Sequence, residues 1–208
     1  MSLNEIDRAG IPTIVWDMDD TLCHLTPVLI NVVFKATGKL LTDDDLARGH
    51  WVQHHVPPEL VNQVEAAIFA PHIYRGLKPS VILHDLVGPK GAQLRQQFRH
   101  HVITARGGAL GNVAMPISHA WLSDWHMKLD GLSITHPDDN KMDYAPRSVL
   151  AVVDDSARVI QHALADGCYG ILVDHPWNRK FLSSHKNFRR VAPENLVSFL
   201  TELLVPQL

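Results

Sequence analysis

Short apolar runs recur along the chain, and segments with a helical spacing of apolar residues lie between most of them. The runs are Thr13 to Trp16, Val102-Ile103, Leu132 to Thr135, Val149 to Val153 and Gly170 to Val173. Their length and their β-branched residues predict buried strands. Pro116 opens a segment that runs to Met127, and Ser156 precedes another that stops at Gly167, which are helix start and stop signals. Strands that alternate with helices predict an α/β fold with a mainly parallel sheet and helices on both faces.

The segment of residues 24–76 breaks this alternation because it has only helical signals. Thr26-Pro27 opens one helix that ends near Gly38, Thr42 and Asp45 resemble a capping box, and Pro57-Pro58 opens a helix to about Phe69. We therefore expect a helical cap at 24–76, inserted after the first strand, and a core made of residues 1–23 and 77–208. Such a cap would lie over the carboxyl end of the first strand, the edge of an open α/β sheet where ligands bind.

Composition and charge narrow the classes of partner. The chain has 208 residues and a formal net charge of −3, and its basic residues are scattered. We therefore expect no binding to a nucleic-acid polymer or to an anionic membrane surface. The two cysteines, Cys23 and Cys168, lack metal or redox spacing, and no apolar stretch approaches the ~20 residues that span a bilayer. A cytoplasmic location is the expectation, and the oligomeric state is open.

Groups of two or more carboxylates follow two of the apolar runs. Asp17, Asp19 and Asp20 come directly after the first run, and Asp154-Asp155 after the fourth. If these two strands are parallel neighbours about 4.8 Å apart, their carboxyl ends bring the acids into one site. Crowded carboxylates raise each other's pKa unless a cation lies between them, and Mg²⁺ prefers such oxygen ligands together with a substrate phosphate. Asp20 is expected only to cap the next turn.

A third strand end can supply contacts to a phosphate. The stretch "HVITARGG" places Thr104, Ala105 and Arg106 behind a strand, with a hydroxyl and backbone N–H groups available for phosphate oxygens. Lys141, in the polar loop before the strand that ends near Asp154, can supply a positive charge. Lys128 is the competing lysine.

These residues, in this order, resemble the motifs of the haloacid dehalogenase superfamily of phosphotransferases. Its first motif is matched by Asp17, Asp19 and Thr21, its second by Thr104, its lysine by Lys141 and its paired acids by Asp154-Asp155. The resemblance covers most of the chain. It implies a Rossmann-like core and a Mg²⁺-dependent phosphomonoester hydrolase that acts on a small phosphorylated substrate.

The resemblance also implies a role for each residue. Asp17 would be the nucleophile that forms an aspartyl phosphate, and Asp19 would be the general acid and base. Mg²⁺ would be held by Asp17, by the backbone carbonyl of Asp19 and by Asp155, with Asp154 in support; which of the paired acids binds directly is left open. Thr104 and Lys141 would bind the phosphoryl oxygens.

Two further stretches, "RGHWVQ" and "ILVDHPWN", resemble segments of the 5′(3′)-deoxyribonucleotidases. The resemblance places Trp51 at the base pocket and implies nucleoside 5′-monophosphates as substrates. Packing of Trp51 within the cap is an equal alternative. A sugar phosphate or another small metabolite phosphate is the alternative substrate, and a non-catalytic Mg²⁺-binding module is the alternative of a different class.

Overall fold

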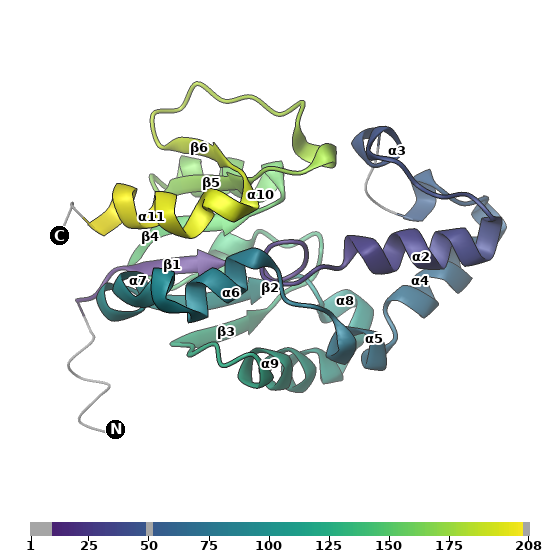
Figure 1. Cartoon of the computed structure of the whole chain (residues 1–208), viewed down its shortest axis with the longest axis horizontal. Coiled ribbons are helices and arrows are strands. Elements are labelled where there is room, and N and C mark those ends of the chain that lie inside the picture. The colour runs from purple at the N-terminus through teal and green to yellow at the C-terminus, as the bar shows by residue number, and fades with distance from the viewer. Residues whose placement is uncertain (1–9, 49–51, 206–208) are drawn as a thin grey trace.

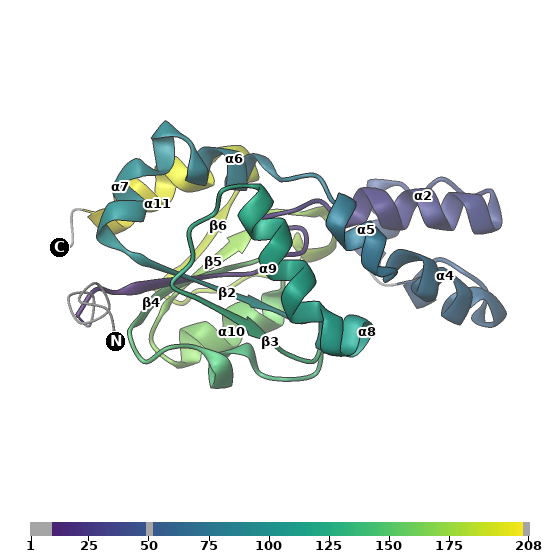
Figure 2. The ribbon, with the colours of Figure 1, turned by 90° about the horizontal axis from the view of Figure 1, so that it is seen from below.

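The five apolar runs form strands of one sheet in the computed structural model, which describes residues 10–48 and 52–205 (Figures 1 and 2). All neighbouring strands are parallel, in the order β3-β2-β1-β4-β5-β6. The strands are β1 Thr13–Trp16, β2 Arg99–Thr104, β3 Gly131–Ile134, β4 Val149–Asp154, β5 Tyr169–Val173 and β6 Phe188–Val191. The predicted Rossmann-like α/β fold is confirmed, and β1 and β4 are parallel neighbours.

Helices cover both faces of this sheet. The α-helices are α2 Thr26–Thr37, α3 Asp43–Arg48, α4 Val61–Ile68, α5 Pro71–Gly76, α6 Val81–Val87, α7 Ala92–Gln97, α8 Gly107–Leu110, α9 Ala114–Asp124, α10 Ala157–Ala165 and α11 Leu196–Leu204. The 3₁₀ helices are η1 Val52–His54, η2 Pro58–Leu60, η3 Pro89–Gly91, η4 Gly111–Val113, η5 Lys141–Tyr144, η6 Pro176–Asn178 and η7 Pro193–Asn195. Helices α6, α7 and α11 gather on one face and α10 lies on the other (Figure 2).

The central strand β1 shows why both faces need cover. Ile14 and Trp16 belong to the large core cluster, which also includes residues of α6 and α11. Val15 points the opposite way and packs with Val159 of α10. Side chains alternate between the two faces of a strand, so a run that is apolar at every position must be buried on both. Its carboxyl end is therefore the part of the strand that is free to open into a site.

The segment between β1 and α6 contains helices α2, α3, α4 and α5, which we call the insertion helices. They lie beyond the carboxyl ends of the strands (Figure 1). Helix α2 starts at the expected Thr26 and ends before Gly38, whose φ of 75° suits a glycine. Thr42 and Asp45 form the expected capping box, with Oγ1 of Thr42 3.3 Å from the Asp45 amide. Helix α5 packs against α9, and α3 packs against η6.

Several boundaries differ from those expected. Helix α9 starts at Ala114, two residues before Pro116, because the first turn of a helix needs no N–H from its third residue. It also ends at Asp124 rather than Met127. Helix α6 starts at Val81, where Ser80 accepts a hydrogen bond from the Leu83 amide.

None of the helices in the described ranges is long and apolar enough to cross a membrane.

Candidate active site

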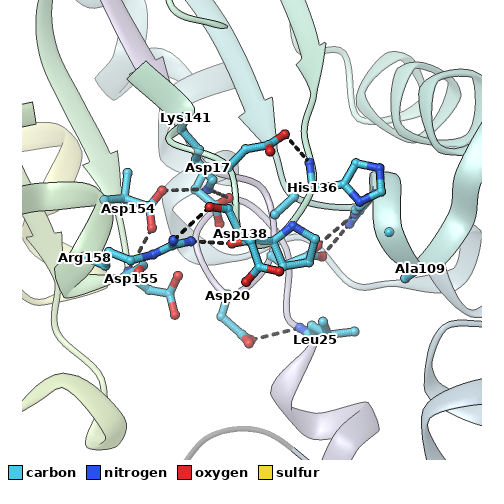
Figure 3. Close-up of a pocket in the computed structure, with 18 of the residues that line it drawn as sticks. Asp17, Asp20, Leu25, Ala109, His136, Asp138, Lys141, Asp154, Asp155 and Arg158 are labelled. Atoms are coloured by element: carbon cyan, nitrogen blue, oxygen red, sulfur yellow. Dashed lines mark hydrogen bonds and ion pairs between the residues drawn. The ribbon is translucent and has the colours of Figure 1, made fainter. Parts of the chain in front are cut away.

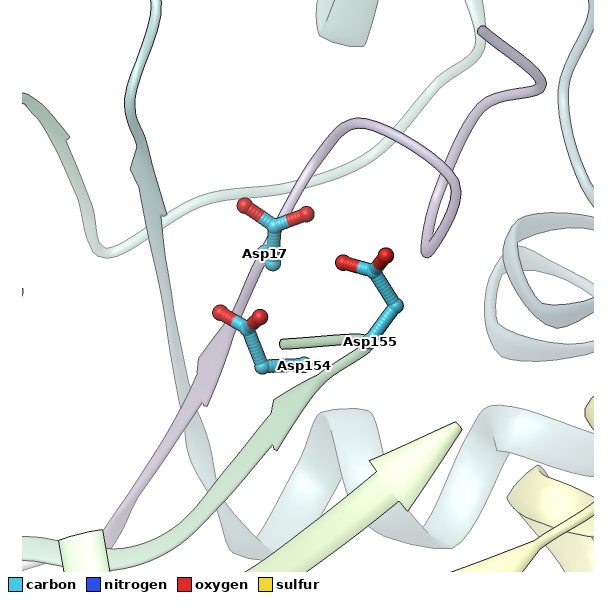
Figure 4. A group of neighbouring side chains, drawn as sticks. All are labelled: Asp17, Asp154 and Asp155. Atoms are coloured by element: carbon cyan, nitrogen blue, oxygen red, sulfur yellow. The ribbon is translucent and has the colours of Figure 1, made fainter. Parts of the chain in front are cut away.

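Three carboxylates meet where β1 and β4 end. Asp17 follows β1 directly, Asp154 is the last residue of β4, and Asp155 is next along the chain. The strand register pairs Trp16 with Val153, and the Asp17 amide donates to the Val153 carbonyl at 2.9 Å. One carboxylate oxygen of each of the three residues lies within 4.8 Å of the others (Figure 4). The expected meeting of the two acidic strand ends is thus present.

Lys141 lies between two of these acids. It is the first residue of η5 and is buried, and its Nζ donates to Asp17 Oδ1 at 2.5 Å and to Asp154 Oδ2 at 2.8 Å (Figure 3). Burial disfavours its charge, but Asp154 and Asp17 outweigh burial and raise the pKa of Lys141. Lys128, the competing lysine, is exposed after α9 and does not line the site.

The single positive charge of Lys141 does not fully compensate the negative charge of these acids. Burial, together with Asp154 and Asp19, raises the pKa of Asp17 to about 7 despite the nearby ammonium group. Burial likewise raises the pKa of Asp154. Two buried carboxyl groups that share one lysine and lie beside a third acid are held in their charged form by an added cation.

The donor set fits Mg²⁺. All three groups are carboxylates, the hard oxygen ligands that this ion prefers, and oxygens bound to one such ion lie at most about 4.2 Å apart. The observed limit of 4.8 Å for Asp17, Asp154 and Asp155 is close to that spacing. The side chain of Asp19 is not part of this group.

Asp19 is instead bound by Arg106. Arg106 Nη2 donates to Asp19 Oδ1 at 2.6 Å, and Nε donates to Oδ2 at 2.9 Å. The guanidinium is buried, lies 4.4 Å from the ring centre of Tyr74 in α5, and also donates to Ser118 Oγ at 3.2 Å. Burial disfavours its charge, but Asp19 outweighs burial and raises the pKa of Arg106. The arginine expected to bind substrate therefore has its main partner within the protein.

Asp20 has the local role expected of it. Its φ is 57°, a conformation that aspartate tolerates better than most residues. Its Oδ1 accepts from the amides of Leu25 and Thr26, both at 2.9 Å, and its Oδ2 accepts from the Thr26 hydroxyl at 2.8 Å. These bonds satisfy the first free amides of α2 and fix how the chain leaves the sheet.

The other residues expected to bind substrate lie in different places. Ala105 and Arg106 line the cavity described below. Thr104 is fully buried at the end of β2, is not among the lining residues, and its hydroxyl has no hydrogen-bond partner among the described atoms. Trp51 lies outside the described residues.

A cavity of about 1000 Å³ opens over the three carboxylates. Asp17, Lys141, Asp154 and Asp155 line it on the core side, with Arg158 and the loop from His136 to Asp139 at its rim (Figure 3). The segment between β1 and α6 contributes polar and apolar side chains, namely Leu25, Gln53, Glu65, Phe69 and Tyr74. Side chains of this segment and of the strand ends therefore line the same cavity.

Two lining residues that were not expected are Trp177 and Asn178, which follow β5. Trp177 Nε1 donates to Asp155 Oδ2 at 2.7 Å, and Asn178 Nδ2 donates to the Asp155 carbonyl at 2.8 Å. The stretch "DHPWN" comes directly after an apolar strand, as the other acidic strand ends do. Its position at a strand end could have identified it.

Comparison with known proteins finds solved structures with a similar fold. No family model matches the chain, and no curated protein matches it. A haloacid dehalogenase-like family hydrolase from Streptococcus pneumoniae aligns with a TM-score of 0.63 and 12% identity over 92% of this chain and 99% of that one. CbbY from Rhodobacter sphaeroides, solved in complex with phosphate, aligns with a TM-score of 0.55 and 14% identity over 89% and 96%. YfnB from Bacillus subtilis, solved with bound magnesium, gives 0.55 and 14% over 94% and 99%.

At these identities the likeness concerns the fold. The chain has the fold of haloacid dehalogenase-like hydrolases over nearly the whole of both chains. Its function has to be argued from its own site.

Proposed function

We propose that this protein is a Mg²⁺-dependent phosphomonoester hydrolase of the haloacid dehalogenase type, working through an aspartyl phosphate on Asp17. The observation that carries the proposal is the buried cluster of Asp17, Asp154 and Asp155 with Lys141, on the floor of a large cavity. A purely structural ion pair would need neither three acids nor a cavity. The expected cytoplasmic location and the absence of a nucleic-acid or membrane partner remain predictions.

Asp17 is proposed as the nucleophile. Its carboxylate would attack phosphorus opposite the leaving oxygen, so that a new bond forms from Asp17 to phosphorus as the bond to the leaving group breaks. Lys141 Nζ, 2.5 Å from Asp17 Oδ1, is placed to donate to the phosphoryl oxygens as they approach. When bound by Asp17, Asp154, Asp155 and the Asp19 carbonyl, Mg²⁺ neutralises the charge that the carboxylates and the phosphoryl oxygens share.

Asp19 is proposed as the acid and base. It would protonate the leaving oxygen and then take a proton from the water that hydrolyses the aspartyl phosphate. Both of its oxygens accept hydrogen bonds from Arg106 in the structure. Proton transfer by Asp19 therefore requires that at least one oxygen be released from the guanidinium. Arg106 would contribute by holding the Asp19 carboxylate in one position before the proton transfer.

The cavity supports a substrate larger than phosphate itself. Cavities of about 300–1,000 Å³ hold organic ligands of substantial size, and this one has about 1000 Å³. Phe69 and Phe181 offer aromatic surface, and Gln53 and Glu65 offer polar groups. This combination supports a nucleoside 5′-monophosphate, whose base has two flat faces and a polar edge. Lys141, Ala105 and Thr104 remain the proposed contacts of the phosphoryl group, and Trp51 of the base.

Phosphate release from p-nitrophenyl phosphate tests the reaction. The wild-type protein should release phosphate only when Mg²⁺ is present, and Asp17→Asn should abolish the release while its circular dichroism spectrum is unchanged. Asp166→Asn, an exposed aspartate after α10, is the matched control and should keep full activity. Undiminished activity of Asp17→Asn would remove this residue as nucleophile. Mg²⁺ binding without any release by the wild type would instead identify a binding module.

A substrate panel tests the proposed preference for nucleoside 5′-monophosphates. Deoxynucleoside and nucleoside 5′-monophosphates should exceed hexose and triose phosphates in kcat/KM. If sugar phosphates are equal or better, the nucleotide preference is wrong while the phosphatase proposal stands.

A further inference from the structure

His175 and Trp177 flank the first residue of η6, above the end of β5, and have no part in the chemistry proposed above. Their rings stack with centres 4.3 Å apart and planes 6° from parallel. The stack lies between the loop that follows β1 and the loop that follows β4. Those two loops carry the acids of the proposed metal site.

Each ring is bonded to one of the two loops. Trp177 Nε1 donates to Asp155 Oδ2 at 2.7 Å, a short bond for an indole N–H and a carboxylate. His175 Nε2 lies 2.7 Å from the backbone carbonyl of Asp20. A carbonyl only accepts, so Nε2 carries the hydrogen and donates to it. The stacked pair thus joins the loop of Asp17 to the loop of Asp155.

The stack is itself anchored to the sheet by Asn178. This buried amide donates to the Val173 carbonyl at 2.7 Å and to the Asp155 carbonyl at 2.8 Å. Its Oδ1 accepts from the His175 amide at 3.2 Å and from Arg190 Nη1, in β6, at 2.6 Å. Helix α3 packs against the same turn. The rings are therefore held from several directions and are a firm support for the carboxylate.

We propose that the His175–Trp177 stack is a clamp that positions Asp155 for divalent-cation binding at the Asp17, Asp154 and Asp155 site. The inference rests on the proposed function, because it assumes that Mg²⁺ binds there. The hydrogen bond from the Trp177 indole to Oδ2 restricts rotation of the Asp155 side chain. The hydrogen bond from His175 to the Asp20 carbonyl fixes the distance between the loop after β1 and Asp155. Trp177 and His175 are positioning residues, since they act through Asp155 and Asp20.

The clamp makes a quantitative prediction for affinity. Groups that hydrogen-bond to metal ligands typically contribute about 10–100-fold to metal affinity. Trp177→Phe keeps an aromatic ring for stacking and removes the N–H, so it isolates the bond to Asp155. We expect it to raise the Kd for Mg²⁺ by about 10-fold or more.

Isothermal titration calorimetry with MgCl₂ on the full-length protein, without substrate, measures this directly. Trp125→Phe is the matched control, because Trp125 packs against His84 and Trp121 and does not line the cavity. Its Kd should equal that of the wild type. In an Asp155→Asn background, Trp177→Phe should cause a much smaller change, since the two residues act through one bond. An unchanged Kd for Trp177→Phe overturns the clamp, and absence of Mg²⁺ binding by the wild type overturns the proposed function and the clamp together.

The wild-type protein provides a readout that does not depend on how well a variant folds. In a Mg²⁺ titration followed by NMR, the indole N–H resonance of Trp177 should move along the calorimetric binding curve. The indole groups of Trp16 and Trp121 donate to His100 and to the Leu77 carbonyl, so their resonances should stay in place. A Trp177 resonance that does not respond while Mg²⁺ binds would contradict the clamp.

Discussion

The two aspartates at the end of β1 have their charges balanced in opposite ways. Asp17 shares the one ammonium group of Lys141 with Asp154, and Asp155 lies beside them. Asp19 has both of its oxygens bonded to the guanidinium of Arg106. Three carboxylates around one ammonium group retain negative charge, whereas a carboxylate and a guanidinium make a neutral pair.

The difference distinguishes the Asp17 cluster, which can attract a ligand, from Asp19, whose charge is balanced within the protein. Excess negative charge beside a cavity favours binding of a divalent cation and, through it, of a phosphate. A neutral pair has no such tendency, and it keeps its carboxylate in one orientation. The residues lie two apart in the chain, so the fold, more than their identity, determines which of them faces the cation.

After the loss of Asp17 itself, the largest effect should come from removing the shared lysine. Lys141→Ala takes away the positive charge nearest to the proposed nucleophile, and we expect kcat/KM for p-nitrophenyl phosphate to fall by about 10²–10³-fold. Steady-state assays at saturating Mg²⁺ measure it. Lys128→Ala, an exposed lysine, is the control and should behave as the wild type. Equal losses in both variants, or a loss only in Lys128→Ala, would reject Lys141 as the phosphate-binding lysine.

A smaller and more selective effect is expected at the neutral pair. Arg106→Lys retains the charge but cannot make the two parallel bonds, so Asp19 should be less well placed. Alkyl leaving groups need protonation more than nitrophenolate does, and general acid catalysis contributes about 10²–10⁴-fold where it is needed. The loss of kcat should therefore be about 10-fold greater for an alkyl phosphate than for p-nitrophenyl phosphate. The same loss with both substrates would mean that Arg106 does not act through Asp19.

The pH dependence of stability should report the protonation of Asp17. The pKa of Asp17 rises from 3.8 to about 7 on folding, so between these values the folded state binds more protons than the unfolded state. This contribution to stability is complete below about pH 4 and is lost as the pH rises through about 7. Without Mg²⁺, the wild type should lose up to about 1.4 kcal/mol per pH unit more than Asp17→Asn across this window. Thermal melts of both proteins at several pH values measure the difference, and parallel curves would contradict it.

The smallest effect is expected at Asp20. Asn at this position keeps an acceptor for the Leu25 and Thr26 amides and tolerates the positive φ, so Asp20→Asn should cost about 1 kcal/mol or less. Its kcat should match that of the wild type, in contrast to Asp17→Asn. Urea unfolding and steady-state kinetics check the two statements. A large loss of activity in a stable protein would give Asp20 a part in the chemistry.

The sheet was largely predictable because the apolar runs of β1, β4 and β5 are nearly continuous. Strand β2 was predicted only at Val102-Ile103, since its first residues are Arg99, His100 and His101. His100 is nevertheless buried, where Trp16 donates to its Nδ1 at 3.0 Å. A pattern of apolar residues does not reveal a polar side chain that is buried with a partner.

Edge strand β6 escaped prediction for a related reason. Its sequence, Phe188–Val191, holds two arginines between two apolar residues. Arg190 reaches Asp174 at 2.8 Å and Asn178 at 2.6 Å, contacts that join residues 12 to 16 positions apart. An edge strand needs less apolar cover than a central one, so such a strand has a weak signature in sequence.

The candidate site likewise has residues that were predicted from the sequence and residues whose partners were not. The positions of Asp17, Asp154 and Asp155 follow from strand ends and were predicted, and Lys141 was preferred over Lys128. The partner of Asp19 was not, because Arg106 lies 87 positions away and its orientation depends on packing against Tyr74 of α5. The bond from Trp177 to Asp155 likewise depends on how the β5 loop folds back. Side-chain pairing across loops is set by tertiary packing. The spacing of residues along the chain does not predict it.

The central claim is that Asp17 forms the covalent intermediate, and trapping that intermediate tests it most directly. The wild-type protein is mixed with p-nitrophenyl phosphate and Mg²⁺, quenched in acid within milliseconds, digested and analysed by mass spectrometry. We predict that the peptide containing Asp17 carries one phosphoryl group, that the group is lost on treatment with hydroxylamine, and that Asp17→Asn yields none. A phosphoryl group on another residue, or its retention in Asp17→Asn, would contradict the account.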